Sequence, residues 1–294
     1  MHALIAQSVG VAIALGAAQQ AARAQIIFGQ IDDFQDGSTM NWKEGVPSPN
    51  QPVNVANGGP NGAGDRYLSD ISSGGAGAGS KQLMFNDVRW TGDYNAADVT
   101  RATGMMANFG ATTLSMRYAL QGGAFVTQYA STNAIVIPPD GQWHAVTFII
   151  SNATMSDVNF GPDSLADVLA GVTEARILSN AAGPSWFGET IVSTLGMDNL
   201  RATTLAGDAN HDRTIDTIDF NLLAANFGGT SKVWAQGDFN YDTLVDTVDF
   251  NLLASNFSQT VPAASTISTL VPEPGALLPV AFLAASLVAR TRFR

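Results

Sequence analysis

Two stretches near the carboxyl end carry oxygen-bearing side chains at a spacing that suits a calcium ion. Residues 207–228 read GDANHDRTIDTIDFNLLAANFG and residues 237–258 read GDFNYDTLVDTVDFNLLASNFS, with 14 of the 22 aligned positions identical. Counted from the first aspartate of each loop, carboxylate or amide oxygens fall at positions 1, 3, 5, 9 and 12. They belong to Asp208, Asn210, Asp212, Asp216 and Asp219 in the first loop, and to Asp238, Asn240, Asp242, Asp246 and Asp249 in the second.

This spacing is that of an EF-hand loop, in which a tight turn aims alternate residues at a hard cation with about six to eight oxygen ligands. The backbone carbonyl of position 7, from Thr214 or Leu244, completes each set. Position 6 is usually glycine but is Arg213 or Thr243 here, and we expect both to take a strained left-handed backbone. Position 12 is aspartate rather than the longer glutamate. Because Zn²⁺ prefers His or Cys, the sequence predicts two bound Ca²⁺ ions.

Each loop leads into a segment with apolar residues at helical spacing. We predict that the two stripes pack against each other and that Gly228 follows the first helix as its C′ residue. Without cations the clustered carboxylates would repel one another, so folding of this region should depend on the metal. The stripes consist of Phe220, Leu223, Ala224 and Phe227, and of Phe250, Leu253, Ala254 and Phe257.

A duplicated calcium loop followed by a helix, with no helix before it, resembles the type I dockerin module. The resemblance implies a calcium-bound pair of loops that docks onto a cohesin domain of another protein. It places the recognition residues at loop positions 10 and 11, which are Thr217 and Ile218, and Thr247 and Val248. The alternative is that calcium only holds a small helical pair together, with no cohesin partner.

Both ends of the chain have the pattern of targeting signals. An apolar run over 3–18 and the small-x-small sequence Ala22-Arg23-Ala24 predict a secretory signal peptide, the alternative being a buried helix. Residues 271–275 read VPEPG and precede an apolar stretch and three arginines. This order resembles the PEP-CTERM sorting signal of exported bacterial proteins. It implies exosortase-type sorting machinery, transient anchoring by a C-terminal transmembrane helix, and delivery to the cell surface or extracellular matrix. An ordinary anchor helix is the alternative.

The residues between these regions, 25–203, predict a mainly β domain. Residues 114–120 alternate between apolar and polar or small side chains, whereas 143–150 is nearly all apolar and predicts a strand covered on both faces, with His144 in the core. Several such runs, separated by glycine-, proline- and asparagine-rich loops, predict a two-sheet sandwich. One short helix is expected over 164–170, with Asp163 as its N-cap.

The two ends of this domain, IDDFQDG from residue 31 and GMDNL from residue 196, resemble those of jelly-roll domains related to carbohydrate-binding modules. The resemblance implies adjacent first and last strands and a third, structural Ca²⁺ ion held by Asp33 and Asp198. The alternative is two solvated carboxylates. Trp90 and Trp186 lie in turn-bounded segments and are the candidate glycan-binding residues, because aromatic faces stack on sugar rings; otherwise they belong to the core.

Composition excludes several functional classes. A net charge of −11 argues against nucleic acid as a partner, and the absence of cysteine excludes disulfides and thiolate chemistry. The chain has four glutamates and shows no nucleophile elbow or phosphate loop, which gives catalysis little support.

The predicted organisation is a signal peptide over 1–24, a jelly-roll β-sandwich over 25–203, a dockerin-like helical module over 204–258, a linker over 259–270 and a sorting signal over 271–294. We expect an exported, non-catalytic protein that binds calcium, docks onto a partner and binds polysaccharide. The alternatives are a polysaccharide-degrading hydrolase or lyase, and a purely structural surface or matrix protein.

Overall fold

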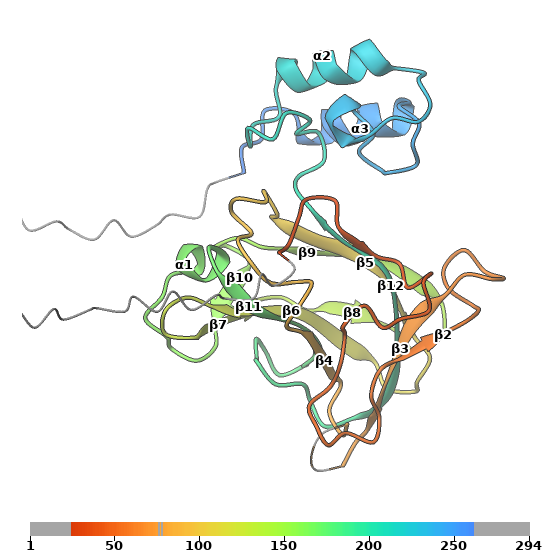
Figure 1. The fold of residues 1–294 in the computed structure, drawn as a ribbon, viewed down its shortest axis with the longest axis vertical. Coiled ribbons are helices and arrows are strands. Elements are labelled where there is room, and N and C mark those ends of the chain that lie inside the picture. Colours follow the sequence, from red (N-terminus) through yellow and green to blue (C-terminus); the bar gives the residue numbers. More distant parts are fainter. Residues whose placement is uncertain (1–24, 76, 78, 262–294) are drawn as a thin grey trace, which may run out of the picture. The chain divides into compact units, whose positions relative to one another are not determined.

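The computed structural model describes residues 25–75, 77 and 79–261 (Figure 1). The predicted signal peptide and sorting signal lie outside these residues, as does most of the predicted linker. Within the described part of the chain, no helix is both long and apolar enough to cross a membrane.

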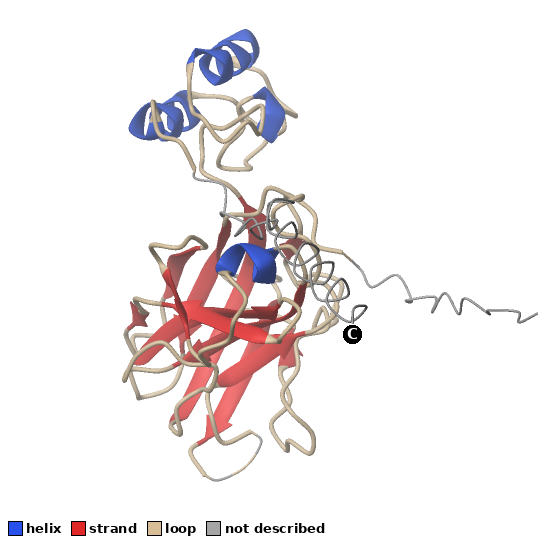
Figure 2. Ribbon diagram, turned by 90° about the vertical axis from the view of Figure 1, so that its left-hand side faces the viewer, coloured by secondary structure: helices blue, strands red, loops and turns tan. Residues whose placement is uncertain are grey.

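Two antiparallel sheets form a mainly β sandwich, with few helices (Figures 1 and 2). Strand β1 (Ile31–Asp32) pairs with β12, so the first and last strands are adjacent as expected, with Asp32 opposite Leu200. The first sheet has the order β2 (Val53–Val55), β3 (Tyr67–Ser73), β12 (Val192–Thr203), β5 (Arg101–Asn108), β9 (Trp143–Ile149). The second has the order β10 (Met155–Asp157), β7 (Thr127–Ser131), β6 (Leu114–Gly122), β11 (Val172–Ser179), β4 (Leu83–Asn86), with β8 (Ile135–Ile137) on β6.

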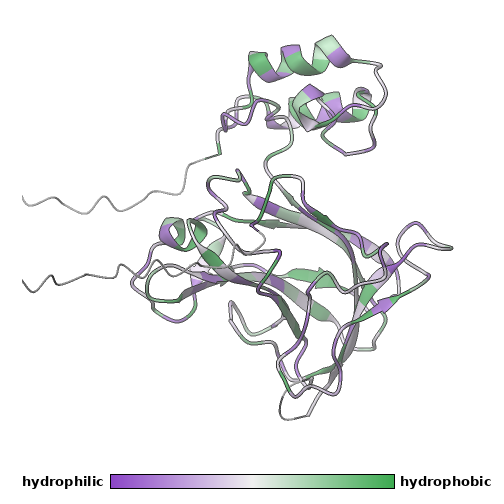
Figure 3. Cartoon of the chain, viewed as in Figure 1, coloured by the Kyte–Doolittle hydropathy of each residue, from purple (hydrophilic) through white to green (hydrophobic). Residues whose placement is uncertain are grey.

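The main core lies between the sheets. Strand β6 sends Leu114, Met116, Tyr118 and Leu120 inward, which confirms the alternation predicted for this segment. Facing strands supply Leu68, Met106 and Met197, among others, and each such burial is worth about 1.5–3 kcal/mol. Hydrophobic and hydrophilic residues accordingly intermingle along the strands (Figure 3).

Strand β9 departs from its prediction. It pairs with β5 alone at the edge of the sheet, and only Val146 and Phe148 of its seven residues are buried. His144 is partly exposed and lies 3.1 Å from the Asp140 carboxylate. The predictions of a strand covered on both faces and of a core histidine are therefore wrong, because no second layer covers the outer face of this strand in the described part of the chain.

The short helix α1 (Leu165–Leu169) forms where predicted, but its N-cap is Ser164, which exchanges capping hydrogen bonds with Asp167. Asp163 instead accepts hydrogen bonds from the Phe125 backbone N–H and the Thr127 hydroxyl, 2.9 and 2.8 Å away. The predicted cap was one residue early because this carboxylate is bonded to a neighbouring loop.

Helices α2 (Thr217–Asn226) and α3 (Thr247–Asn256) follow the sandwich in the chain, separated by the single 3₁₀ turn η1 (Trp234–Gln236). Their loops and ends pair crosswise: the Gly228 N–H donates to the Val245 carbonyl and the Ser258 N–H to the Ile215 carbonyl, each over 2.8 Å. Each copy of the repeat is thus completed by the other. Gly228 has φ of 75°, as expected for a C′ residue.

The two helical stripes do not pack as predicted. Leu223 and Leu253 are buried, and the rings of Phe220 and Phe250 touch, with centroids 6.4 Å apart. The remaining stripe residues, Ala224, Phe227, Ala254 and Phe257, are exposed. The reason is that loop residues and an aromatic cluster fill this small core in their place, namely Ile215, Trp234, Phe239 and Val245.

Candidate functional site

The two predicted calcium loops have the same internal hydrogen bonds. Asp208 at position 1 accepts from the backbone N–H groups of positions 5 and 6 over 3.2 and 2.9 Å, and Asp238 does so over 3.1 and 3.0 Å. Asp219 at position 12 accepts from three backbone N–H groups, those of positions 2, 3 and 9, and Asp249 repeats this arrangement. The loop backbone is therefore wrapped around two carboxylates in each copy.

The backbone strain predicted at position 6 is present in both loops. Arg213 and Thr243 each have φ of 70°, and position 4 is also left-handed, at 62° in His211 and Tyr241. A left-handed conformation costs a residue with a Cβ about 1–2 kcal/mol. Both loops keep this conformation with non-glycine residues, so other interactions must offset its cost.

The carboxylates of positions 1 and 12 are buried, and no ion pair joins Asp208, Asp219, Asp238 or Asp249 to a basic side chain in the described residues. Burial raises the pKa of Asp208 to about 6 and also raises that of Asp238. Buried carboxylates of this kind fit a bound cation, which would compensate their charge.

The other predicted ligands lie nearer the surface. Asn210 donates to Asp212 over 2.8 Å, Asn240 donates to Asp242 over the same distance, and Asp216 and Asp246 cap the helices that follow. Within the described residues, no three Asp, Glu or His side chains converge as a ready-made metal cage. Ion binding would therefore require the outer ligands to turn inward.

The predicted partner-binding residues are accessible. Thr217 and Thr247 are exposed, and Ile218 and Val248 are 52% and 48% exposed at the first turns of α2 and α3. Exposed β-branched apolar side chains at matching positions of two helices give the module two similar small apolar patches.

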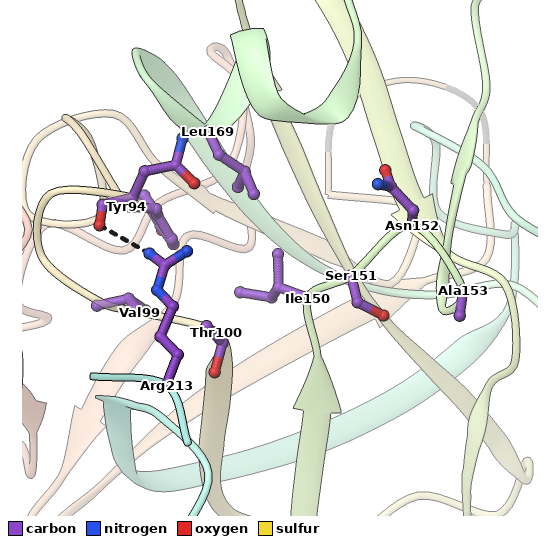
Figure 4. Close-up of a pocket in the computed structure, with 10 residues that line it drawn as sticks. Tyr94, Val99, Thr100, Ile150, Ser151, Asn152, Ala153, Leu169 and Arg213 are labelled. Atoms are coloured by element: carbon purple, nitrogen blue, oxygen red, sulfur yellow. Dashed lines mark hydrogen bonds between the residues drawn. The ribbon is translucent and has the colours of Figure 1, made fainter. Parts of the chain in front are cut away.

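The first loop also contacts the sandwich. Asp98 lies 3.0 Å from His211 Nδ1 and 3.2 Å from Arg213 Nε, and the Arg213 guanidinium donates to the Asn95 carbonyl over 3.1 Å. Arg213 thereby closes one side of a cavity of about 290 Å³ (Figure 4). The other walls of this cavity are largely apolar and include Tyr94, Val99, Ile150 and Leu169.

The two residues of the predicted third calcium site, Asp33 and Asp198, lie close enough for the Asp33 charge to affect the pKa of Asp198. Asp198 is fully buried, and its Oδ1 atom has no hydrogen-bond donor. Burial, together with the nearby carboxylates of Asp65 and Asp33, raises its pKa to about 7. The Gln35 amide nitrogen lies among three oxygens, donating to the Asp33 and Arg66 carbonyls and to the Asp65 carboxylate over 2.8 to 3.3 Å. Sequence reasoning missed Asp65, which lies about thirty residues from Asp33.

Neither predicted glycan-binding tryptophan offers a ring face. Trp90 is completely buried, and its indole N–H donates to Asp32 over 2.7 Å. Trp186 is also buried, and the Arg176 guanidinium lies 3.9 Å from its ring centre. Both predictions are wrong, because tertiary packing covers segments whose turn residues indicated exposed loops.

A groove at the β4 edge of the second sheet has the features expected of a glycan site. It encloses about 310 Å³, and Phe85 and Phe187 contribute aromatic rings. Phe187 is 61% exposed, and Lys81 Nζ lies 5.5 Å from its ring centre. Lys81 and Arg176 supply hydrogen-bonding groups in the same lining, which also includes the largely buried Glu44. No aromatic pattern in the sequence distinguished these phenylalanines from core residues.

No family model and no curated protein matches the sequence. Among solved structures, the family 11 carbohydrate-binding module of Clostridium thermocellum, in complex with a β-1,3-1,4-mixed-linked tetrasaccharide, is 10% identical at a TM-score of 0.41; the match covers 60% of this chain and 96% of that one. A family 22 xylan-binding domain of Paenibacillus barcinonensis is 10% identical at 0.37, covering 60% and 97%. The cleaved adhesin domain K1 of Lys-gingipain from Porphyromonas gingivalis is 15% identical at 0.33, covering 60% and 97%.

Proposed function

We propose that this chain is an exported, non-catalytic protein whose jelly-roll sandwich binds polysaccharide through the β4-edge groove. The observation that supports this proposal is the exposed Phe187 ring in a hollow that is also lined by the cationic side chains of Lys81 and Arg176. Aromatic faces pack on the C–H surface of sugar rings, while charged groups bind their hydroxyls. The loop that carries Phe187 is held in place, because Arg176 donates to the Trp186 carbonyl and Asn180 to the Phe187 carbonyl.

Affinity electrophoresis of the full chain in gels containing mixed-linkage β-glucan or xylan tests this groove. We expect Phe187→Ala to weaken retardation at least tenfold, because the substitution removes the exposed ring. Phe125→Ala is the matched control, since Phe125 is 69% exposed and lies elsewhere on the sandwich. If the two variants were retarded equally, the groove would not be the binding site.

The proposal extends to the module that follows the sandwich, a dockerin-like pair of Ca²⁺ sites. The ligands would be the oxygens of Asp208, Asn210, Asp212, Asp216 and Asp219 with the Thr214 carbonyl, and of Asp238, Asn240, Asp242, Asp246 and Asp249 with the Leu244 carbonyl. The buried carboxylates, which have no cationic partner among the described residues, support this assignment. When bound, the ion would neutralise charge that otherwise opposes folding.

Removal of calcium tests the module. We expect EGTA to lower the helical circular dichroism signal of the full chain and Ca²⁺ to restore it, because α2 and α3 begin at loop carboxylates. An unchanged spectrum and melting curve in chelator, with no ion uptake, would contradict the calcium assignment.

A cohesin-like domain is the partner that we propose for the exposed residues at positions 10 and 11. Capture of the full chain by an immobilised type I cohesin should need Ca²⁺ and be lost in the double variant Ile218→Asp, Val248→Asp. Calcium-dependent folding without capture would show that the ions only hold the helices together. We further propose that exosortase-type sorting delivers the protein to the cell surface or matrix, which proteolytic shaving of intact cells tests.

The enzymatic alternative receives little support from the carboxyl groups near the groove. Glycosidases generally hold two carboxyl groups at least about 5 Å apart on either side of the scissile bond. Glu44 lines the groove, but its close carboxyl neighbour is Asp70, which is fully buried and within hydrogen-bonding reach of it. Absence of both glycan binding and turnover would leave a purely structural surface protein.

A further inference from the structure

Two acidic side chains, one of which lines the β4-edge groove, meet inside the sandwich. Asp70 lies on β3 and is completely buried, and Glu44, from the loop before β2, is 3% exposed. Their carboxyl groups are within hydrogen-bonding reach of each other. Such a pair is unusual in a protein interior, because carboxylates are rarely buried unless a cationic group or a hydrogen-bond donor compensates their charge.

One oxygen of each carboxyl group is held in place by a neighbour. The Ser48 hydroxyl donates to Glu44 Oε2 over 2.5 Å, and the Gln82 amide donates to Asp70 Oδ2 over 2.5 Å. Gln82 is itself fixed, since its carbonyl oxygen accepts from the Ser193 hydroxyl over 2.7 Å. The arrangement therefore orients both carboxyl groups rigidly.

The other two oxygens, Glu44 Oε1 and Asp70 Oδ1, are buried and have no hydrogen-bond donor. Within the described residues, no Lys, Arg or His forms an ion pair with either group. Burial raises the pKa of both groups, and in Asp70 the proximity of Glu44 raises it further. Two ionised carboxylates in this position would repel one another unless a cation or a shared proton lies between them.

Gly79 packs directly against the Ser48 and Glu44 side chains. A Cβ atom at this residue would lie 2.5 Å from Ser48 Oγ and 3.1 Å from Glu44 Oε2, and the residue has φ of 73°. Glu44 and Gly79 also line the β4-edge groove, so the pair lies beside a hollow that opens to solvent. All of the available ligand atoms are oxygens, which hard cations prefer.

We propose that Glu44 and Asp70 bind a Ca²⁺ ion, with the Ser48 hydroxyl as a third oxygen ligand and water from the groove completing the shell. The two carboxylates match the charge of the ion, so the bound site is neutral. This site is separate from the two loops and from Asp198, and it does not require that the groove bind glycan.

Metal content after equilibrium dialysis of the full chain against Ca²⁺ tests the proposal. We expect Asp70→Asn and Glu44→Gln each to bind one ion fewer per chain than the wild type. Asp140→Asn, which alters an exposed carboxylate, should bind the full number. Ser48→Ala keeps both carboxylates and should weaken the affinity of that one ion several-fold, so the site can be tested even if the carboxylate variants fold poorly.

The competing arrangement is a proton shared between the two carboxyl groups. In that case the ion count would not change in any variant, and the chelated wild type would melt at a higher temperature as the pH is lowered from 8 to 6. That combination would overturn the cation site. A calcium-dependent rise in the melting temperature that is smaller in Ser48→Ala and Glu44→Gln than in the wild type would support it.

Discussion

The two calcium-type loops are built from almost the same residues but have different neighbours. In the first, positions 4 and 6 are His211 and Arg213, and both bond to Asp98 of the sandwich. In the second, position 4 is Tyr241, whose ring stacks on Arg201 at 3.8 Å, while Thr243 at position 6 is exposed. The buried carboxylates are the same in the two copies, whereas the differences at positions 4 and 6 change the contacts that each loop makes.

This difference distinguishes the loop residues that shape the backbone from those that contact the rest of the protein. The residues that shape the loop, Asp208 and Asp219, have the same backbone partners as Asp238 and Asp249. The left-handed residues differ between the copies, and so do the contacts of their side chains. In the first loop, contacts with Asp98 offset the strain at position 6; in the second, no such compensation is evident among the described residues.

The largest effect is expected from the carboxylates that the loops share. Asp219→Ala removes the acceptor of three backbone N–H groups, and we expect the loss of about 3–5 kcal/mol from the stability of the module in Ca²⁺. Asp249→Ala should cost slightly less, because only the first loop also carries the bonds to Asp98. Urea denaturation followed by far-UV circular dichroism measures both. A smaller loss of stability for Asp219→Ala than for Asp249→Ala would contradict the expected difference between the two loops.

Glycine substitution at position 6 should act in opposite directions in the two loops. Thr243→Gly relieves a left-handed residue with an exposed side chain, and we expect a gain of about 1 kcal/mol. Arg213→Gly relieves the same strain but removes the bonds to Asp98 and Asn95, so we expect a net loss of about 1 kcal/mol. Thermal melting in Ca²⁺ distinguishes the signs. Equal shifts would mean that the contacts with Asp98 contribute nothing.

The smallest expected effect concerns the second loop. Tyr241→Phe keeps the stacking on Arg201 and removes only the hydroxyl contact with Thr203, so it should cost about 0.5–1 kcal/mol. Tyr241→Leu, which also removes the ring, should cost more. Differential scanning calorimetry of the two variants checks the order, and a larger cost for the phenylalanine variant would be inconsistent with it.

Local patterns in the sequence predicted local structure well. The left-handed backbone of Arg213 and Thr243, the alternation of β6 and the C′ position of Gly228 all depend on nearby residues, and all are present. The approach of Asp198 to Asp65, and of Glu44 to Asp70, depends on strand pairing across long stretches of chain. Spacing along a single sequence carries no signal for such approaches.

Burial was the least predictable property. The tryptophan predictions failed because turn residues around Trp90 and Trp186 indicated exposed loops, whereas Asp32 and Arg176 hold these rings against the fold. The apolar run of β9 indicated a covered strand, yet it lies at a sheet edge. In each case the local residue types are compatible with both outcomes, and distant neighbours determine which one occurs.

The crosswise pairing of the two repeats determines how a pulling force would travel. After α3 the chain runs alongside the first loop, where the Ser258 N–H donates to the Ile215 carbonyl and the Val261 N–H to the Arg213 carbonyl, each over 2.8 Å. A load applied at residue 261 would therefore pass into the first loop, which follows β12 directly, and would largely bypass the second. The first loop would therefore bear the load, and its hydrogen bonds with Ser258 and Val261 would be the first to rupture.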